Sequence, residues 1–136
     1  MEPLTDYVLD TMALVRHLED DLPRSADKVF RQAEDGHGRL FLPEIALAEF
    51  LYVALRGRLR VPSAPTAVQE VLNQLRAASY IVPSNLAAAA WDGFLLVNIP
   101  ELHDRMIATD ALYRGVPLVS GDSVFSTVPG LQVVWR

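Results

Sequence analysis

Short apolar runs alternate with longer amphipathic stretches along nearly the whole chain of 136 residues. Runs of only a few residues, bounded by turn residues and rich in β-branched or aromatic side chains, predict buried strands. Five runs have this character: Tyr7–Leu9, Arg39–Leu42, Tyr80–Val82, Leu131–Trp135 and the short apolar run within Pro117–Asp122 that precedes Asp122.

The longer stretches carry apolar residues at helical spacing and end at glycine, proline or acidic turns. They predict six helices, namely Met12–Leu18 with Thr11 as its cap, Pro23–Glu34, Glu44–Arg56, Thr66–Ala78, Asn85–Val97 and Leu102–Arg114. Strands that alternate with helices are typical of an α/β domain with a central parallel sheet and helices on both faces. No internal repeat or linker divides residues 1–136, so we expect a single domain.

Helix Glu44–Arg56 is apolar on nearly every side, which is typical of a helix at the centre of a domain or at an interface. We expect it to belong to the core first and to a partner-binding groove second. Trp91 and Trp135 are interpreted as packing residues. The alanine run inside Asn85–Val97 indicates helix propensity rather than a functional segment.

Composition excludes several classes of protein. Half of the residues are apolar and 21% are charged, as in an ordinary globular domain. Cysteine is absent, so disulfides, thiolate zinc sites and a cysteine nucleophile are excluded. No apolar run is long enough to span a membrane and no signal-peptide pattern is present, so we expect a soluble, cytoplasmic protein with no membrane partner.

The net charge of −5 argues against a general electrostatic attraction to nucleic acid. A local basic patch remains compatible with it. Arg56, Arg58 and Arg60 form one small basic cluster. They are interpreted either as a solvated cluster or as contacts to RNA or to an acidic protein partner.

Two acidic residues follow predicted strands directly, Asp10 after the first and Asp122 after the fourth. In open parallel sheets, sites form outside the carboxyl ends of the strands. On a helical wheel of Leu102–Arg114, Asp104 falls among small apolar residues, whereas Asp110 falls beside His103 and Arg114. We therefore expect Asp104 to face the site, and Asp110 and His103 to be solvated or, for Asp110, ion-paired with Arg114.

Glu49 lies inside the apolar run of its helix, where an uncompensated carboxylate is costly. If Asp10, Glu49, Asp104 and Asp122 converge, each like-charge pair costs roughly 3 kcal/mol at 5 Å and an effective dielectric of 20. Protonation or a divalent cation must then compensate the charge. All-oxygen ligands favour Mg²⁺ or Mn²⁺, and such a site is suited to hydrolysis of a phosphodiester or another phosphate ester.

Four segments resemble, in order, the acidic motifs of the PIN domain: VLDTMAL, LPEIALAEFLY, LHDRMIATDAL and PLVSGD, at Val8–Leu14, Leu42–Tyr52, Leu102–Leu112 and Pro117–Asp122. The likeness is greatest to the VapC toxins of bacterial VapBC toxin–antitoxin modules. It implies a three-layer α/β/α PIN-like fold. It also implies an endoribonuclease that cleaves single-stranded RNA with Mg²⁺, or with Mn²⁺ in its place. It also implies a VapB-like antitoxin partner and a homodimer.

By position in these motifs, Asp10, Glu49, Asp104 and Asp122 correspond to the catalytic and metal-binding acids. Ser120 corresponds to the hydroxyl residue that often precedes the last acid, and with Thr11 it is assigned a supporting role. Asp110 departs from the pattern, because many relatives have a small apolar residue at that position.

Each acid taken alone has an ordinary structural explanation: Asp10 and Asp122 as helix caps, and Glu49 as a surface residue. A haloacid-dehalogenase-like phosphatase would need a second aspartate where this chain has Met12, and it would need a late lysine, as would a receiver domain. The only lysine is Lys28, in an early helix. The remaining alternative is a catalytically inactive PIN-like domain that binds protein or RNA.

Overall fold

The computed structural model describes residues 4–136 and is built around a five-stranded parallel sheet. The strand order is β3-β2-β1-β4-β5, and every neighbouring pair is parallel. The strands are short: β1 (Tyr7–Leu9), β2 (Leu40–Pro43), β3 (Ile81–Ser84), β4 (Leu118–Val119) and β5 (Val133–Val134).

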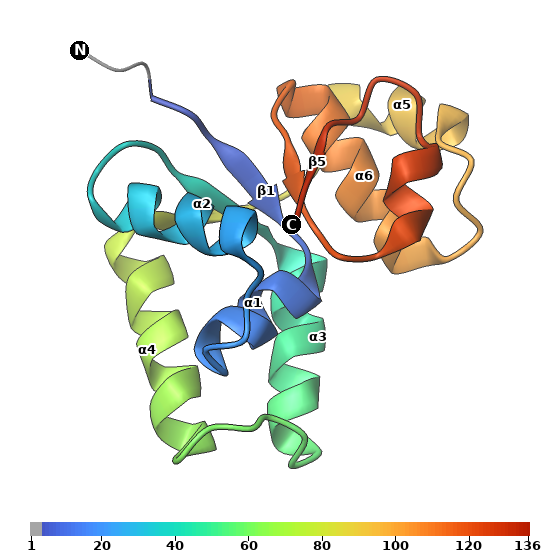
Figure 1. Cartoon of the computed structure of the whole chain (residues 1–136). Helices are drawn as coiled ribbons and strands as arrows, with labels where there is room; N and C mark the ends of the chain where they lie inside the picture. The colour runs from blue at the N-terminus through green and yellow to red at the C-terminus, as the bar shows by residue number, and fades with distance from the viewer. Residues whose placement is uncertain (1–3) are drawn as a thin grey trace.

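Six α-helices flank this sheet within the described residues, together with two 3₁₀ turns. They are α1 (Thr11–Leu18), α2 (Arg24–Glu34), α3 (Glu44–Leu55), α4 (Ala64–Ala77), α5 (Trp91–Leu96) and α6 (Leu102–Arg114), with η1 (Ala88–Ala90) and η2 (Ser123–Thr127). Figure 1 shows α1, α2 and α4 gathered on one side of β1 and α5 and α6 on the other. The predicted α/β/α arrangement is confirmed.

The central strand β1 is the most enclosed part of the sheet, since Val8 and Leu9 have no exposed surface. Helices cover both faces of a parallel sheet, which explains why its strands are apolar runs without polar alternation. The chain leaves β1 toward β2 and β3 on one side of the sheet, but leaves β4 toward β5 on the other. This reversal between β1 and β4 is the topological switch point, where ligands bind in open α/β sheets.

Most predicted elements agree with the structure to within two residues at each end. The exception is the predicted helix Asn85–Val97, which was wrong in its first half. The chain there contains only the three-residue turn η1 before the six-residue helix α5. The helix propensity of the alanines is therefore overridden by the tertiary structure at this position.

Helix α3 is only partly the central helix that its sequence predicted. Ala46 and Phe50 are buried, and the helix contacts α1, α4 and α6. Its last turns leave Tyr52 and Leu55 exposed, at 61% and 83% respectively. The uniform apolar pattern therefore reflects one buried side and one exposed apolar side. No helix among residues 4–136 is long and apolar enough to cross a membrane.

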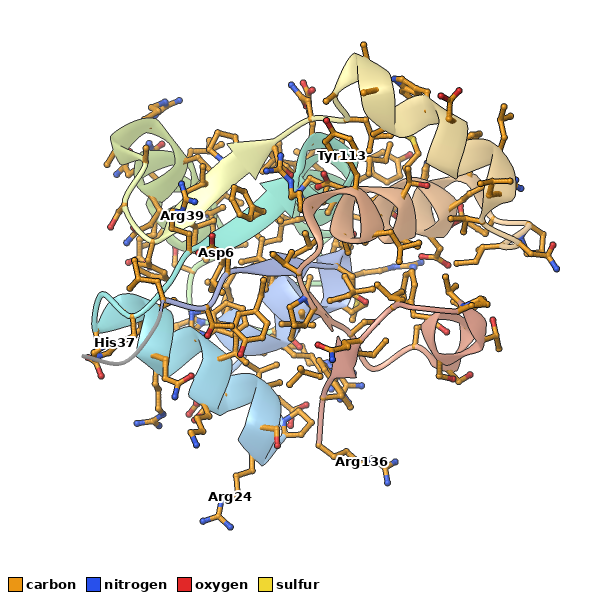
Figure 2. The ribbon with its side chains drawn as sticks, turned by 90° about the horizontal axis from the view of Figure 1, so that it is seen from above. Asp6, Arg24, His37, Arg39, Tyr113 and Arg136 are labelled. Atoms are coloured by element: carbon orange, nitrogen blue, oxygen red, sulfur yellow. The ribbon has the colours of Figure 1, made fainter. Side chains whose placement is uncertain are left out.

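The residues that lead into β1 are bound to those that lead into β2. Figure 2 shows Asp6 and Arg39 side by side, and the Asp6 carboxylate accepts hydrogen bonds from the Arg39 backbone N–H (2.9 Å) and guanidinium (3.1 Å). The neighbouring Gly38 has a φ of +155°, and a Cβ atom there would overlap the backbone carbonyl of Thr5. Only glycine permits this close approach of two backbones.

We predict that Gly38→Ala lowers the free energy of unfolding by about 2 kcal/mol or more, because the methyl group must push the two strand entries apart. Gly36→Ala is the matched control, because Gly36 also has a positive φ of +86° but open space around its Cβ position. Its cost should be near 1 kcal/mol. Urea unfolding of both variants measures the difference, and equal losses would contradict the steric argument.

Candidate active site

A cavity of about 300 Å³ opens at the carboxyl ends of β1 and β4, at the switch point of the sheet. All four acids predicted from the sequence line it, each from a different segment: Asp10, Glu49, Asp104 and Asp122. Thr11 of the predicted supporting pair also lines the cavity. The structure thus brings the predicted acidic set together at one edge of the sheet.

Asp10 is held in place from both sides. Its backbone N–H donates to the Val119 carbonyl (3.2 Å), which continues the β1–β4 pairing by one residue. Its carboxylate accepts from the Ala13 N–H at 2.7 Å and thereby caps α1. The prediction that Thr11 caps this helix was wrong, because the backbone turns one residue earlier and Thr11 is already the first helical residue.

Asp10 is only 7% exposed, and this burial raises the pKa of its carboxyl from 3.8 to about 6. Hydrogen bonding by the Ser120 hydroxyl and the Ala13 amide opposes the increase, and the negative charges of Asp122 and Glu49 add to it. Burial disfavours the charged form, and like charges nearby disfavour it further.

Glu49 is fixed by two neighbours. The Thr11 hydroxyl donates to Glu49 Oε1 at 2.9 Å, which explains the supporting position of Thr11. His103 Nδ1 lies 3.1 Å from Glu49 Oε2 and 3.5 Å from Glu101 Oε1. His103 lies at the start of α6 with 39% of its side chain exposed, as expected of a solvated residue, but its neighbours are Glu49 and Glu101 rather than Asp110, because α3 packs against α6.

Asp104 lies in the first turn of α6, and its backbone N–H donates to the Glu101 carboxylate at 2.7 Å. Burial raises the pKa of the Asp104 carboxyl to about 6, with further contributions from the charges of Glu101, Asp122, Glu49 and Asp10. Each of the other three acids in the cavity therefore acts on Asp104 electrostatically. The prediction that this side chain faces the site is consistent with its position in the cavity wall.

Asp122 and Ser120 occupy the exit of β4. Ser120 is 1% exposed, and its hydroxyl oxygen accepts from the Asp122 N–H at 3.0 Å. The Asp122 carboxylate caps η2 by accepting from the Val124 N–H at 3.0 Å. Ser120 therefore shapes the turn that presents Asp122, and it also stabilises the ionised form of Asp10.

Two residues of the cavity wall were missed in the sequence. Arg16 of α1 lines the cavity, with its guanidinium 5.6 Å from the centre of the Trp135 ring. Trp135 lies so close to Gly121 that a Cβ atom there would overlap its indole. Trp135 was interpreted only as a packing residue. The sequence signal for Arg16 was its spacing, almost two helical turns after Asp10. No sequence pattern indicated that Trp135 would line the cavity.

Asp110 lies outside this cavity, and the expected ion pair is present: Arg114 Nε donates to Asp110 Oδ1 at 2.9 Å. Its interpretation as a possible solvated residue was wrong, since only 2% of Asp110 is exposed. The Ser84 hydroxyl at the end of β3 donates to its other oxygen at 2.9 Å. The Arg114 guanidinium packs 4.1 Å from the centre of the Phe41 ring.

Arg56, Arg58 and Arg60 are exposed beyond the end of α3 and do not line the acidic cavity. Arg56 stacks on Tyr52 of the preceding helical turn, at 5.3 Å from the ring centre. None of the three guanidinium groups forms an ion pair within residues 4–136. Their contact with RNA or antitoxin stays a prediction.

The chemistry of these four carboxylates suits a hard divalent cation, because all of them offer oxygen ligands. Two of them, Asp10 and Asp104, also have a raised pKa. Within the described part of the chain, no three acidic or histidine side chains are close enough as they stand to hold a metal ion. Glu49 is turned toward Thr11 and His103, and Asp122 toward Val124. Metal binding at this cavity therefore requires rotation of these side chains.

Comparisons with solved structures show the same fold. VapBC2 from Rickettsia felis, crystallised bound to a DNA fragment from its promoter, has a TM-score of 0.70 at 18% identity, over 95% of this chain and 97% of that one. PAE2754 from Pyrobaculum aerophilum has a TM-score of 0.60 at 20% identity, over 96% and 91% of the two chains. FitAcB from Neisseria gonorrhoeae has a TM-score of 0.59 at 16% identity, over 93% and 95%.

No curated protein sequence matches the chain. The family described as "PIN domain" matches residues 7–131, which include every element from β1 to η2 and all four acids of the cavity. PIN domains are generally nucleases, and such nucleases usually use divalent metals. The chain belongs to the PIN domain family.

Proposed function

We propose that this protein is a metal-dependent endoribonuclease that hydrolyses phosphodiester bonds of single-stranded RNA, and that it is the toxin of a toxin–antitoxin pair. One observation carries the proposal: four carboxylates from four segments meet in one cavity at the switch point of a PIN-domain sheet. The structural likeness to VapBC2 and FitAcB supports the toxin assignment through the fold.

Asp10, Asp104, Asp122 and Glu49 would hold the divalent cation, with Mg²⁺ as the expected ion and Mn²⁺ as a substitute. A bound cation would stabilise negative charge on the phosphate and lower the pKa of water in the site. The acids themselves are compatible with this role, because burial and, to a smaller extent, mutual repulsion disfavour the fully ionised cavity in the absence of a cation.

The residues of the chain have distinct tasks in this proposal. Without the cation, the carboxyls of Asp10 and Asp104 have a pKa of about 6 and are mostly ionised at neutral pH, so either is available to bind the cation or to orient the attacking water. Thr11 holds Glu49, and Ser120 orients the segment that carries Asp122. Water is the nucleophile, so no covalent enzyme intermediate forms.

Arg16 supplies positive charge beside these acids. It is the one basic residue among those that line the cavity in the described structure, and it packs against Trp135. A guanidinium recognises a phosphate through two parallel N–H bonds. We assign Arg16 to the RNA phosphate and Trp135 to holding the guanidinium in place.

Exposed apolar residues support the proposed protein partners, a VapB-like antitoxin and a second copy of this chain. Leu55 at the end of α3 is 83% exposed, and Leu95 and Leu96 of α5 are 73% and 85% exposed. Such residues gathered on two helices are typical of surfaces that bind other proteins. We also propose a cytoplasmic location, which fits the absence of cysteine.

The alternative is a PIN-like domain that binds protein or RNA without cleaving it. The present side-chain positions favour it in one respect, since within residues 4–136 no three acidic or histidine groups form a ready metal site. The two proposals differ in their response to divalent cations. A catalytic site must bind the cation, whereas a binding module has no need of it.

We predict that the protein cleaves single-stranded RNA with Mg²⁺ or Mn²⁺ and that EDTA abolishes cleavage. Asp10→Asn and Asp104→Asn should each reduce the rate by about 100-fold or more, because a group that accepts a proton or binds the cation is lost. Asp92→Asn, an exposed acid of α5, is the matched control and should cleave normally. Cleavage that survives EDTA, or that survives both active-site substitutions, would contradict the mechanism.

We also predict an unusual dependence of stability on pH in the absence of divalent cations. The carboxyls of Asp10 and Asp104 have a pKa of 3.8 in the unfolded chain and about 6 when folded. Between these pH values the folded protein binds more protons than the unfolded one, so the contribution of these groups to stability falls as pH rises. For Asp10 the loss is at most about 3 kcal/mol, and for the more exposed Asp104 it is smaller because solvent screens the charge.

Urea unfolding in EDTA from pH 4 to pH 7.5 checks this prediction by comparing wild type with Asp10→Asn. Asparagine keeps the helix cap but cannot ionise, so the variant should become more stable relative to wild type as the pH rises. A stability difference between the two proteins that does not change with pH would show that Asp10 titrates normally in the folded state.

For Arg16 we predict that Arg16→Ala raises KM for RNA about tenfold with a smaller change in kcat, because one phosphate contact is lost. The slope of log affinity against log salt should decrease in magnitude by about 1. Arg24→Ala, in the first turn of α2 and outside the cavity, is the control. If both variants change KM and the salt slope equally, Arg16 has no specific role in binding the substrate.

A further inference from the structure

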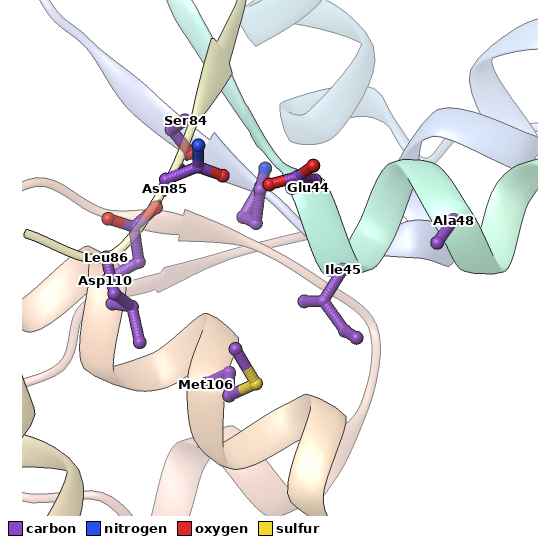
Figure 3. Close-up of a pocket in the computed structure, with 9 residues that line it drawn as sticks. Glu44, Ile45, Ala48, Ser84, Asn85, Leu86, Met106 and Asp110 are labelled. Carbon is purple, nitrogen blue, oxygen red and sulfur yellow. Dashed lines mark hydrogen bonds between the residues drawn. The ribbon is translucent and has the colours of Figure 1, made fainter.

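A second cavity lies at the same edge of the sheet, beyond the carboxyl ends of β2 and β3. It has a volume of about 260 Å³ and is mostly apolar. Its apolar walls are Ile45 of α3, Met106 of α6 and Leu86, which lies between β3 and η1. Figure 3 shows Glu44 and Asn85 facing each other on one side of this cavity, Met106 of α6 on the opposite side and Asp110 of α6 beside Leu86. No acid of the first cavity lines it.

The two cavities share two walls, because α3 and α6 each contribute residues to both. On α3, Ala48 of the second cavity is followed directly by Glu49 of the first. On α6, Asp104 of the first cavity is two residues before Met106 of the second. The two cavities therefore lie next to each other along both helices.

The polar groups of the second cavity differ in whether their hydrogen-bonding atoms already have partners. Asp110 forms its floor, with one carboxylate oxygen bound by Arg114 and the other by Ser84. Glu44 is exposed and forms no ion pair within residues 4–136. With its amide nitrogen toward Glu44, Asn85 donates to Oε2 at 2.6 Å, which leaves Glu44 Oε1 and the amide oxygen of Asn85 as acceptors.

We propose that this second cavity binds a guanine base of the RNA, next to the phosphate at which the acidic cavity acts. The inference rests on the proposed ribonuclease function and adds the base that directs cleavage. Ile45, Leu86 and Met106 contact the faces of the ring, and the thioether of methionine packs favourably on aromatic rings. Glu44 and Asn85 read its Watson–Crick edge, as proteins do for unpaired bases of single-stranded RNA.

Guanine is favoured because its donors match these acceptors. Its Watson–Crick edge presents two adjacent donors, N1–H and the N2 amino group, for Glu44 Oε1 and the amide oxygen of Asn85 to accept. Adenine and cytosine present only one donor beside an acceptor nitrogen, and uracil places one donor between two carbonyl oxygens. For these three bases an acceptor of the base faces an acceptor of the protein, which costs binding energy.

The negative charge of the cavity also excludes other ligands. Glu44, which has no ion-pair partner within residues 4–136, would repel a phosphate or a carboxylate, so a base of the RNA suits this cavity better than its backbone. Three of its lining residues, Glu44, Ala48 and Asn85, are exposed, so a base of a single strand can reach the cavity from solvent. A small neutral ring with hydrogen-bond donors on one edge fits these constraints.

The first test compares cleavage of short single-stranded RNAs that differ only in one base at each position around the cleaved bond. Wild type should prefer guanine at one fixed position by roughly tenfold to a hundredfold in kcat/KM, as expected for one bidentate contact to a base. Glu44→Gln should reduce this preference at least about tenfold, through slower cleavage of the guanine RNA. Glu70→Gln, an exposed acid of α4, is the matched control and should keep the preference.

Inosine distinguishes a hydrogen bond to the base edge from a simple fit of its size. Inosine lacks the N2 amino group of guanine but keeps its shape, so wild type should cleave an inosine RNA more slowly than the guanine RNA. Glu44→Gln should cleave both at similar rates. Equal cleavage of inosine and guanine RNAs by wild type, a preference for another base, or an unchanged preference in Glu44→Gln overturns the proposal.

A binding measurement separates failure of this proposal from failure of the ribonuclease function. Guanosine 5′-monophosphate added in EDTA at millimolar concentration should shift the NMR signals of the Met106 methyl group and the Asn85 side-chain amide. Adenosine, cytidine and uridine monophosphates should shift them less, and Glu44→Gln should lose the selectivity. Selective shifts without RNA cleavage contradict only the ribonuclease function, whereas cleavage without selective shifts overturns only the guanine site.

Discussion

The parallel pairing of β1 with both β2 and β4 is the constraint on which the rest of the structure depends. Because the chain continues from β1 toward one side of the sheet and from β4 toward the other, the segments that follow these strands must diverge. A cavity at the carboxyl edge is the direct geometric result. Asp10 and Asp122 are placed in it by the backbone itself, since each follows the end of one of the two diverging strands.

The other half of the site depends on the contact between α3 and α6. This contact brings Glu49 and His103 to 3.1 Å and holds Asp104 opposite the two strand-end acids. The arrangement is electrostatically unfavourable for an empty cavity, as the raised pKa values of Asp10 and Asp104 indicate. A stability-optimised protein would not gather these charges, so their convergence in a PIN-domain fold supports a function that uses them.

The sequence allowed the fold and the acids to be predicted because strand-end positions and motif order depend on local patterns. Asp10 and Asp122 follow apolar runs, and the order of the four motifs gives the order of the elements. The contact of His103 with Glu49 and the burial of Asp110 were missed because a helical wheel describes one helix and not its neighbours. The burial of Asp110 depends on Ser84, and the position of His103 depends on Glu49; both partners are distant in the sequence.

Helix α3 explains why this carboxyl edge has two different environments. The helix begins with Glu44 at the second cavity and carries Glu49 to the first, with apolar residues between them that pack toward α6. The first cavity gathers carboxylates and one arginine, which suits a cation and a phosphate. The second is apolar with acceptors at its rim, which suits a base. Since a nucleotide combines these same two chemistries at adjacent positions, a ribonuclease that selects its cleavage site accounts for both cavities at once.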